Sequence, residues 1–425
     1  MELKIGKARF PVPSFRLAAT APKAQQKRQP SQKKKKASAF AKEKKELLQS
    51  IRKNSLNADT RLVGKAFSFI AGIPGIPKAR GERLLVEKAF SFSEEKHGSQ
   101  KRLSGDPYFS HAFQTALILS EYGLDSSTIS AALLHDVIED TDVKDAEIRE
   151  KFGDDVLKLV SGVTKLRHSE GKEAEAEEKE YLKSVLRASS EDVRVLLIKL
   201  ADKVHNLRTI EFMPPKRRKE ICRNALEVYA PLAERFGLNR MREEIEDRGF
   251  QALYPGEFEE MAKAVEERRN QQELDVDEVA KALSAIKISG RKRFFQKYSF
   301  RKIKRNLYSY YRKTQKKHRT LDELYDFVSL VILCGTVGEC YEALKTVHST
   351  FYPIPGKLKD RIAAPHYMTY QSISTSVIGP KGNPVKIFIR TKEMDLLAEN
   401  GITVWLKEKS KAKLDEKELE SLGEI

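Results

Sequence analysis

The stretch that decides the fold is SAALLHDVIEDT, residues 130–141. It begins with small and apolar residues suited to a buried helix, and then places His135 next to Asp136. Glu139 and Asp140 follow one helical turn later, so a continuous helix would carry two polar stripes on one side. Polar groups gathered on an otherwise apolar helix indicate a site that holds a cation or moves a proton.

The periodicity outside this stretch divides the chain. Apolar residues recur at helical spacing over residues 56–255, with Gly and Pro between the repeats, which predicts an all-α domain. We predict a charged helical linker at 256–290. β-branched runs flank a helical segment over 291–410, which predicts a mixed α/β domain, and residues 411–425 form a charged tail. We therefore expect a multidomain chain with an all-α domain followed by a mixed α/β domain.

The positive charge of the chain is concentrated at its N-terminus. Residues 1–50 hold eleven Lys, three Arg and three Glu, which supply +11 of the net charge of +18. Residues 1–55 are polar, repetitive and poor in large apolar side chains, so we predict a basic, disordered arm. Two interpretations stay open: a solvated tail, and an electrostatic contact with RNA, the ribosome or another acidic surface.

Composition excludes several classes of protein. The chain contains no apolar run of the ~18 residues that span a bilayer, and its N-terminus has no apolar segment typical of a secretory signal. The three cysteines, Cys222, Cys334 and Cys340, are too few and too irregular for a disulfide framework or a thiolate zinc site. We expect a cytoplasmic protein with no membrane partner, and its oligomeric state stays open.

Two other segments place polar groups on apolar helices. IKLADKVHNL (198–207) carries Asp202 and Asn206 four residues apart, and DPYFSHAFQTA (106–116) carries His111. A lone histidine on an apolar face is more often a hydrogen-bonded core residue, and an acidic pair is more often a helix end. Together, however, two histidines and two carboxylates suit a divalent metal of intermediate hardness such as manganese.

Longer strings resemble the Rel/SpoT homologue family, which makes and degrades (p)ppGpp. The resemblance covers roughly residues 84–410 and includes the order His…His-Asp…Asp typical of HD phosphohydrolases. The strings are HGSQKRLSGDPYFSHA (97–112), AALLHDVIEDT (131–141), FGDDVLKLVSGVTKL (152–166), LLIKLADKVHNLRT (196–209) and YAPLAERFGLNRMREEIED (229–247). The resemblance implies an all-α HD phosphohydrolase domain followed by a nucleotidyltransferase-like synthetase domain.

The resemblance also implies roles for individual residues. The implied manganese ligands are His111, His135, Asp136 and Asp202. The residues implied to handle the attacking water are Glu139 and Asp140. Asn206 is also implied to be a catalytic residue. The residues implied to contact the nucleotide are Arg102, Arg208 and Thr209. The expected reaction is manganese-dependent hydrolysis of the 3′-diphosphate of (p)ppGpp to GDP or GTP and pyrophosphate.

The second domain resembles a synthetase that has lost part of its site. Asp326 matches a metal-binding aspartate of the family. Tyr370 matches a tyrosine that stacks on guanine, and Gln371 matches the residue that follows this tyrosine. Lys386, however, stands where the family carries Glu, and Val331 stands where it carries Arg. A lysine at that position repels magnesium and removes a base, so we predict an inactive synthetase domain.

Two other functions stay open. The chain could be bifunctional, with both synthesis and hydrolysis, although Lys386 and Val331 argue against synthesis. It could instead be a regulatory protein that senses guanine nucleotides, although a pure binding module would not need Glu139 and Asp140. Incubation with ppGpp and Mn²⁺, and separately with ATP and GDP, distinguishes the three.

Overall fold

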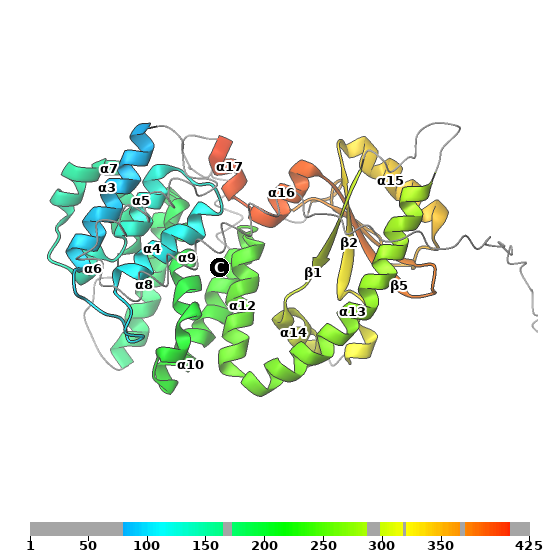
Figure 1. The fold of residues 1–425 in the computed structure, drawn as a ribbon, viewed down its shortest axis with the longest axis horizontal. Coiled ribbons are helices and arrows are strands. Elements are labelled where there is room, and N and C mark those ends of the chain that lie inside the picture. Colours follow the sequence, from blue (N-terminus) through cyan, green and yellow to red (C-terminus); the bar gives the residue numbers. More distant parts are fainter. Residues whose placement is uncertain (1–79, 165–171, 287–297, 318–319, 366–369, 409–425) are drawn as a thin grey trace, which may run out of the picture. The chain divides into compact units, whose positions relative to one another are not determined.

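A computed structural model describes residues 80–164, 172–286, 298–317, 320–365 and 370–408 (Figure 1). The predicted basic arm (1–55) and charged tail (411–425) lie outside the described residues. None of the helices in the described ranges is both long enough and apolar enough to cross a membrane.

The first part of the described chain is all-helical, as the sequence predicts (Figure 1). Its helices are α3 (Arg80–His97), α4 (Phe109–Ser120), α5 (Ser126–Leu134), α6 (Val137–Asp140), α7 (Asp145–Val163), α8 (Lys172–Glu191), α9 (Arg194–Arg208), α10 (Pro215–Asn224), α11 (Ala230–Arg235) and α12 (Asn239–Leu253). A short 3₁₀ turn, η2 (Ile210–Phe212), and a π-helical turn, η3 (Ala225–Tyr229), connect the later helices.

Helix α5 lies at the centre of this domain. It packs against α3, α4 and α7, and Leu133 and Leu134 are at most 1% exposed. Asp125 caps its first turn, because its Oδ1 accepts a hydrogen bond from the backbone N–H of Thr128 at 2.8 Å. Burial of each leucine contributes about 1.5–3 kcal/mol. The apolar half of the stretch therefore fixes the place of the polar half in the core.

The helix is interrupted at the polar pair. Helix α5 ends at Leu134 and α6 begins at Val137, so the prediction of one continuous helix through this stretch is wrong. The His135 side chain supplies a physical reason. Its Nδ1 lies 2.8 Å from the carbonyl oxygen of Ala132, so the ring takes up a carbonyl in the last turn of α5.

The second part is mixed α/β, again as predicted, with a sheet ordered β1-β2-β5-β4-β3. Strands β2 and β5 are parallel, and the other neighbours are antiparallel. The strands are β1 (Ser299–Lys304), β2 (Val328–Cys334), β3 (Lys359–Asp360), β4 (Ile373–Ile378) and β5 (Pro384–Thr391). The helices are α13 (Pro255–Ala285), α14 (Leu307–Lys317), α15 (Val337–Thr350), α16 (Lys392–Asn400) and α17 (Thr403–Glu408), with a 3₁₀ turn η5 at Leu321–Glu323.

Helix α13 belongs to the core of this second domain. Val276, Val279 and Leu283 are fully buried in one cluster with residues of β2, β4, β5 and α15. Nearer its start, Val265 packs with Tyr310 in a second cluster. The sequence prediction of a connecting helix at 256–290 did not anticipate this packing.

Alternation along β5 separates core residues from those on the opposite face of the sheet. Val385, Ile387 and Ile389 lie in the core cluster under α13 and α15. Lys386 and Phe388 point to the other face, because successive residues of a strand alternate. On this second face, Lys386 lies 3.6 Å from the carboxylate of Asp326.

Candidate metal centre

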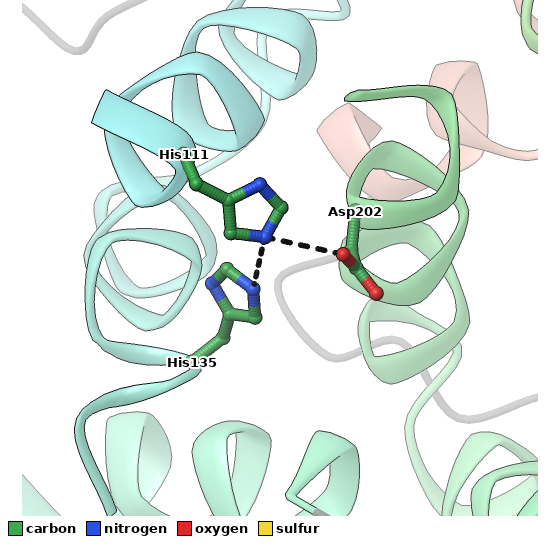
Figure 2. A group of neighbouring side chains, drawn as sticks. All are labelled: His111, His135 and Asp202. Atoms are coloured by element: carbon green, nitrogen blue, oxygen red, sulfur yellow. Dashed lines mark hydrogen bonds and ion pairs between the residues drawn. The ribbon is translucent and has the colours of Figure 1, made fainter. Parts of the chain in front are cut away.

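Three helices bring the predicted metal ligands together. His111 lies on α4, His135 directly follows α5, and Asp202 lies on α9, and α4 packs against both of the other helices. All three side chains are buried. One donor atom from each lies within 4.8 Å of the other two, the spacing of a group that can hold a metal ion (Figure 2).

The contacts inside this group join atoms that bind metals. Nε2 of His111 lies 3.2 Å from Nε2 of His135 and 3.2 Å from Oδ1 of Asp202 (Figure 2). Burial lowers the pKa of His111, so its ring is held neutral in the folded protein. Neutral imidazole and ionised carboxylate are the forms that coordinate a metal.

The tautomer of His135 follows from its partner. Nδ1 of His135 faces the carbonyl oxygen of Ala132 and must carry the proton that the oxygen accepts. In this tautomer, Nε2 of His135 carries a lone pair in place of a proton, and this lone pair points at Nε2 of His111. If Nε2 of His111 also carries no proton, the two nitrogen lone pairs and the carboxylate oxygen of Asp202 repel one another, and a cation among them would relieve that repulsion. The residues therefore fit a divalent metal.

Asp136 lies at the edge of this group. Its Oδ1 is 3.2 Å from Nε2 of His135, and its Oδ2 is 3.5 Å from Nε2 of His111. The hydroxyl of Tyr108 donates to Oδ2 at 3.3 Å. Burial, followed by the charge of Asp136, raises the pKa of Tyr108, so the hydroxyl keeps its proton. Asp136 contacts both histidines, and its role as a fourth ligand stays a prediction.

A buried lysine supports Asp202. Nζ of Lys199 lies 3.0 Å from Oδ2 of Asp202, which leaves Oδ1 directed at His111. Burial alone would raise the pKa of the Asp202 carboxyl, but the Lys199 charge holds it well below its usual range. The sequence prediction missed Lys199. Its signal was the spacing, since residues three apart on a helix are neighbours.

Arg102 and Asn206 extend the site by hydrogen bonds. Nη2 of Arg102 donates to Oδ1 of Asn206 at 2.7 Å, and Nδ2 of Asn206 donates to Oδ1 of Asp202 at 2.5 Å. Thr209 ends α9, and its hydroxyl contacts the carbonyl oxygens of His205 and Asn206 at 3.5 and 3.4 Å. Of the three predicted nucleotide contacts, Arg102 is thus connected to the metal group through Asn206, and Thr209 bonds only to backbone carbonyls of its own helix.

Arg208 points to a different partner. It forms a bidentate ion pair with Glu244 of α12, with both N···O distances 2.7 Å. Burial alone would lower the pKa of Arg208, but the bond to Glu244 raises it. A nucleotide contact by Arg208 would require it to leave this partner.

The predicted acid–base pair lies on α6. Glu139 and Asp140 are half-buried and follow Asp136 by three and four residues. The side chain of Gln100 donates to the backbone oxygen of Asp140 at 2.7 Å and so anchors the end of this short helix. A role for these carboxylates with the attacking water stays a prediction.

The second domain surrounds Asp326 with cations. Lys313 lies 3.0 Å from the carboxylate, Arg305 3.2 Å and Lys386 3.6 Å. Burial alone would raise the pKa of Asp326, but these charges, that of Arg305 first, lower it to about 2. In the same domain, the guanidinium of Arg361 lies over the ring of Tyr370 at 5.6 Å from its centre. Gln371 directly follows Tyr370 and is half-buried.

Two known families match the two parts of the chain. Residues 89–239 match the HD domain, and residues 302–413 match the region found in RelA / SpoT proteins. A GTP pyrophosphokinase of Streptomyces coelicolor is 41% identical over 335 residues, which cover 77% of this chain and 38% of that protein. A guanosine-3′,5′-bis(diphosphate) 3′-pyrophosphohydrolase of Aquifex aeolicus is 42% identical over 322 residues, which cover 75% of this chain and 45% of that protein.

The chain spans less than half the length of these two relatives. A solved structure described as a metazoan ortholog of SpoT that hydrolyzes ppGpp is 28% identical and covers 39% of this chain and 85% of its own. Its TM-score is 0.29. The chain thus carries an HD domain followed by a region found in RelA / SpoT proteins.

Proposed function

We propose that this chain hydrolyses (p)ppGpp with the help of a divalent metal, for which manganese is the best match. Water adds across the bond between O3′ and the diphosphate, and the products are GDP or GTP and pyrophosphate. The observation that carries the proposal is the convergence of His111, His135 and Asp202, a nitrogen and oxygen set suited to such an ion. The name of the Aquifex relative supports the choice of substrate.

We assign metal binding to the residues that gather around His111, and proton transfer to the two carboxylates of α6. A metal held by His111, His135, Asp202 and Asp136 would lower the pKa of the attacking water and polarise the diphosphate. Glu139 and Asp140 accept the proton of that water, since α6 begins directly after Asp136.

The substrate contacts are proposed at Arg102, Asn206 and Thr209. A guanidinium has five N–H donors, so Arg102 keeps donors for a phosphate beyond its bond to Asn206. Asn206 bonds to both Arg102 and Asp202, and Thr209 at the end of the same helix is proposed as a further nucleotide contact.

The test is incubation of purified protein with ppGpp, followed by nucleotide chromatography. We expect GDP and pyrophosphate with Mn²⁺, and no product after treatment with EDTA. Asp202→Asn should be inactive at any metal concentration, because an amide replaces the ionised ligand. Full activity in EDTA would refute the proposed metal dependence, and no hydrolysis with any divalent metal would refute the proposed reaction.

We also propose that the second domain does not transfer pyrophosphate. Transfer from ATP needs acidic groups that hold magnesium, and here three cations already lie around Asp326. Lys386 supplies one of them at the position where the resemblance leads us to expect glutamate. The bifunctional alternative has its own support in the names of several relatives, which include GTP pyrophosphokinases.

Synthesis is tested in a protein whose hydrolase is silent, because active hydrolysis would hide slow synthesis. Asp136→Ala supplied with ATP and GDP should form no ppGpp, and Lys386→Glu in the same background should not restore it. Formation of ppGpp by the Asp136→Ala protein would instead show a bifunctional enzyme. Tight binding of GDP with neither reaction would favour a nucleotide sensor.

A contact between the basic arm and RNA or the ribosome stays a separate proposal, as does a cytoplasmic location. Electrostatic binding to RNA weakens steeply with salt. A short RNA should therefore bind the full chain at low salt and lose most of that affinity when residues 1–55 are removed.

A further inference from the structure

His205 is a buried histidine of α9 for which the sequence predicted no role. It lies three residues after Asp202 and is 7% exposed. Its ring lies beside that of His111, with 4.9 Å between the ring centres.

The contacts of His205 fix the position of its proton. Nη1 of Arg102 lies 3.2 Å from Nδ1 of His205. A guanidinium can only donate hydrogen bonds, so Nδ1 of His205 must be the acceptor and carries no proton.

The same nitrogen then fixes the tautomer of His111. Nδ1 of His111 lies 2.7 Å from Nδ1 of His205, and one of the two must donate. Since Nδ1 of His205 is an acceptor, Nδ1 of His111 carries the proton. Nε2 of His111 is left as a lone pair, directed at His135 and Asp202. A histidine that binds a metal through one nitrogen usually donates from the other in this way.

Arg102 therefore lies in a fork formed by two residues of α9. One branch is the contact with His205, and the other is the 2.7 Å hydrogen bond to Oδ1 of Asn206. His205 touches the candidate ligand His111, and Asn206 touches the candidate ligand Asp202. The two branches join the arginine to both sides of the metal group.

We propose that His205 is a positioning residue that couples metal binding to substrate binding. By accepting two hydrogen bonds at Nδ1, it holds His111 in the metal-binding tautomer and holds Arg102 toward the phosphates of the substrate. The coupling to substrate rests on the proposed function, whereas the coupling to the metal does not. Loss of the acceptor should weaken both interactions, and loss of the ring alone should weaken neither.

Two substitutions separate the acceptor from the ring. In His205→Asn the amide oxygen lies near the place of Nδ1 and can accept from both partners. In His205→Leu the side chain has a similar size but no acceptor. His205→Gln extends its amide toward the place of Nε2, so it serves as a polar variant in which the acceptor is misplaced.

The first readout is Mn²⁺ affinity of the metal-free protein, measured by calorimetry without substrate. Loss of a residue that orients a metal ligand typically weakens affinity by ~10- to 100-fold. We expect that loss in His205→Leu and His205→Gln, and affinity within ~3-fold of the parent in His205→Asn. Equal losses in the Asn and Leu variants, or none in the Leu variant, would overturn the proposal. If the Leu variant does not fold, the comparison of Asn with Gln decides the same question.

The second readout is hydrolysis of ppGpp at saturating Mn²⁺. His205→Leu should raise KM, because Arg102 is no longer held, and His205→Asn should restore it. An unchanged KM in the Leu variant would overturn the substrate half of the proposal. A parent protein that binds Mn²⁺ through this network but does not hydrolyse ppGpp would refute the proposed function and leave the metal half standing.

Discussion

Replacement of Lys386 by Met tests the charge balance around Asp326. Burial is the main cause that lowers the pKa of Lys386 to about 8, and the charge of Arg305 adds to it. The pKa of a lysine in an unfolded chain is about 10.4. Between these pH values the unfolded chain binds more protons than the folded chain, so stability rises with pH. Below the lower value, the buried charge of Lys386 is a constant cost to the folded state.

The size of the effect follows from the two pKa values. Integration of the proton difference from about pH 7.5 to about pH 9.5 gives Lys386 a gain of about 2 kcal/mol in the free energy of unfolding. Lys386→Met has no such group, so it should be more stable than the parent at the lower pH. Its advantage should shrink by about 2 kcal/mol at the higher pH.

The assay is urea denaturation at each pH, followed by the fluorescence of Trp405, the single tryptophan of the chain. Lys359→Met removes the same charge from an exposed position of β3 and controls for the general loss of charge. A stability difference between Lys386→Met and the parent that does not change with pH would refute the argument.

Four further results are expected from the first domain. Glu139→Gln should keep bound Mn²⁺ but lose turnover by ~10²- to 10⁴-fold, the usual value of a positioned acid or base. Asp136→Ala should lose metal and activity together, and equal metal contents in the two variants would contradict this division of roles. Leu133→Ala in the centre of α5 should lower the free energy of unfolding by about 2–5 kcal/mol, measured by urea denaturation. Glu244→Gln should leave KM unchanged if Arg208 is a structural residue, and should lower it if Arg208 is released to bind the nucleotide.

Sequence pattern predicted the elements of this fold well, because its helices are long and strongly periodic. It failed at the junction of α5 and α6, where spacing alone suggested a continuous helix. The interruption comes from a hydrogen bond between the His135 side chain and a carbonyl of its own helix. The spacing of apolar residues does not predict a hydrogen bond between a side chain and the backbone.

In the candidate site, too, the sequence pattern predicted some residues and missed those whose role depends on three-dimensional contacts. Motifs on three separated segments pointed to His111, His135, Asp136 and Asp202, and the structure brings these side chains into contact. The residues that support them, Lys199 and His205, were missed. Each is a common residue on a helix, and its role depends on a partner within hydrogen-bond distance.

The packing of α13 determines where this chain can be divided. A fragment that ends near residue 290 would keep the helix but lose the sheet, and would expose Val276, Val279 and Leu283 to water. A fragment that starts there would lack α13, so the sheet residues that α13 covers would be exposed. The backbone N–H of Val328 would also lose its acceptor, because it donates to Gln272 at 2.7 Å. Cleavage near Tyr254, just before the helix begins, avoids both exposures. The core of the second domain therefore begins within α13, well ahead of the first residue that its family match covers.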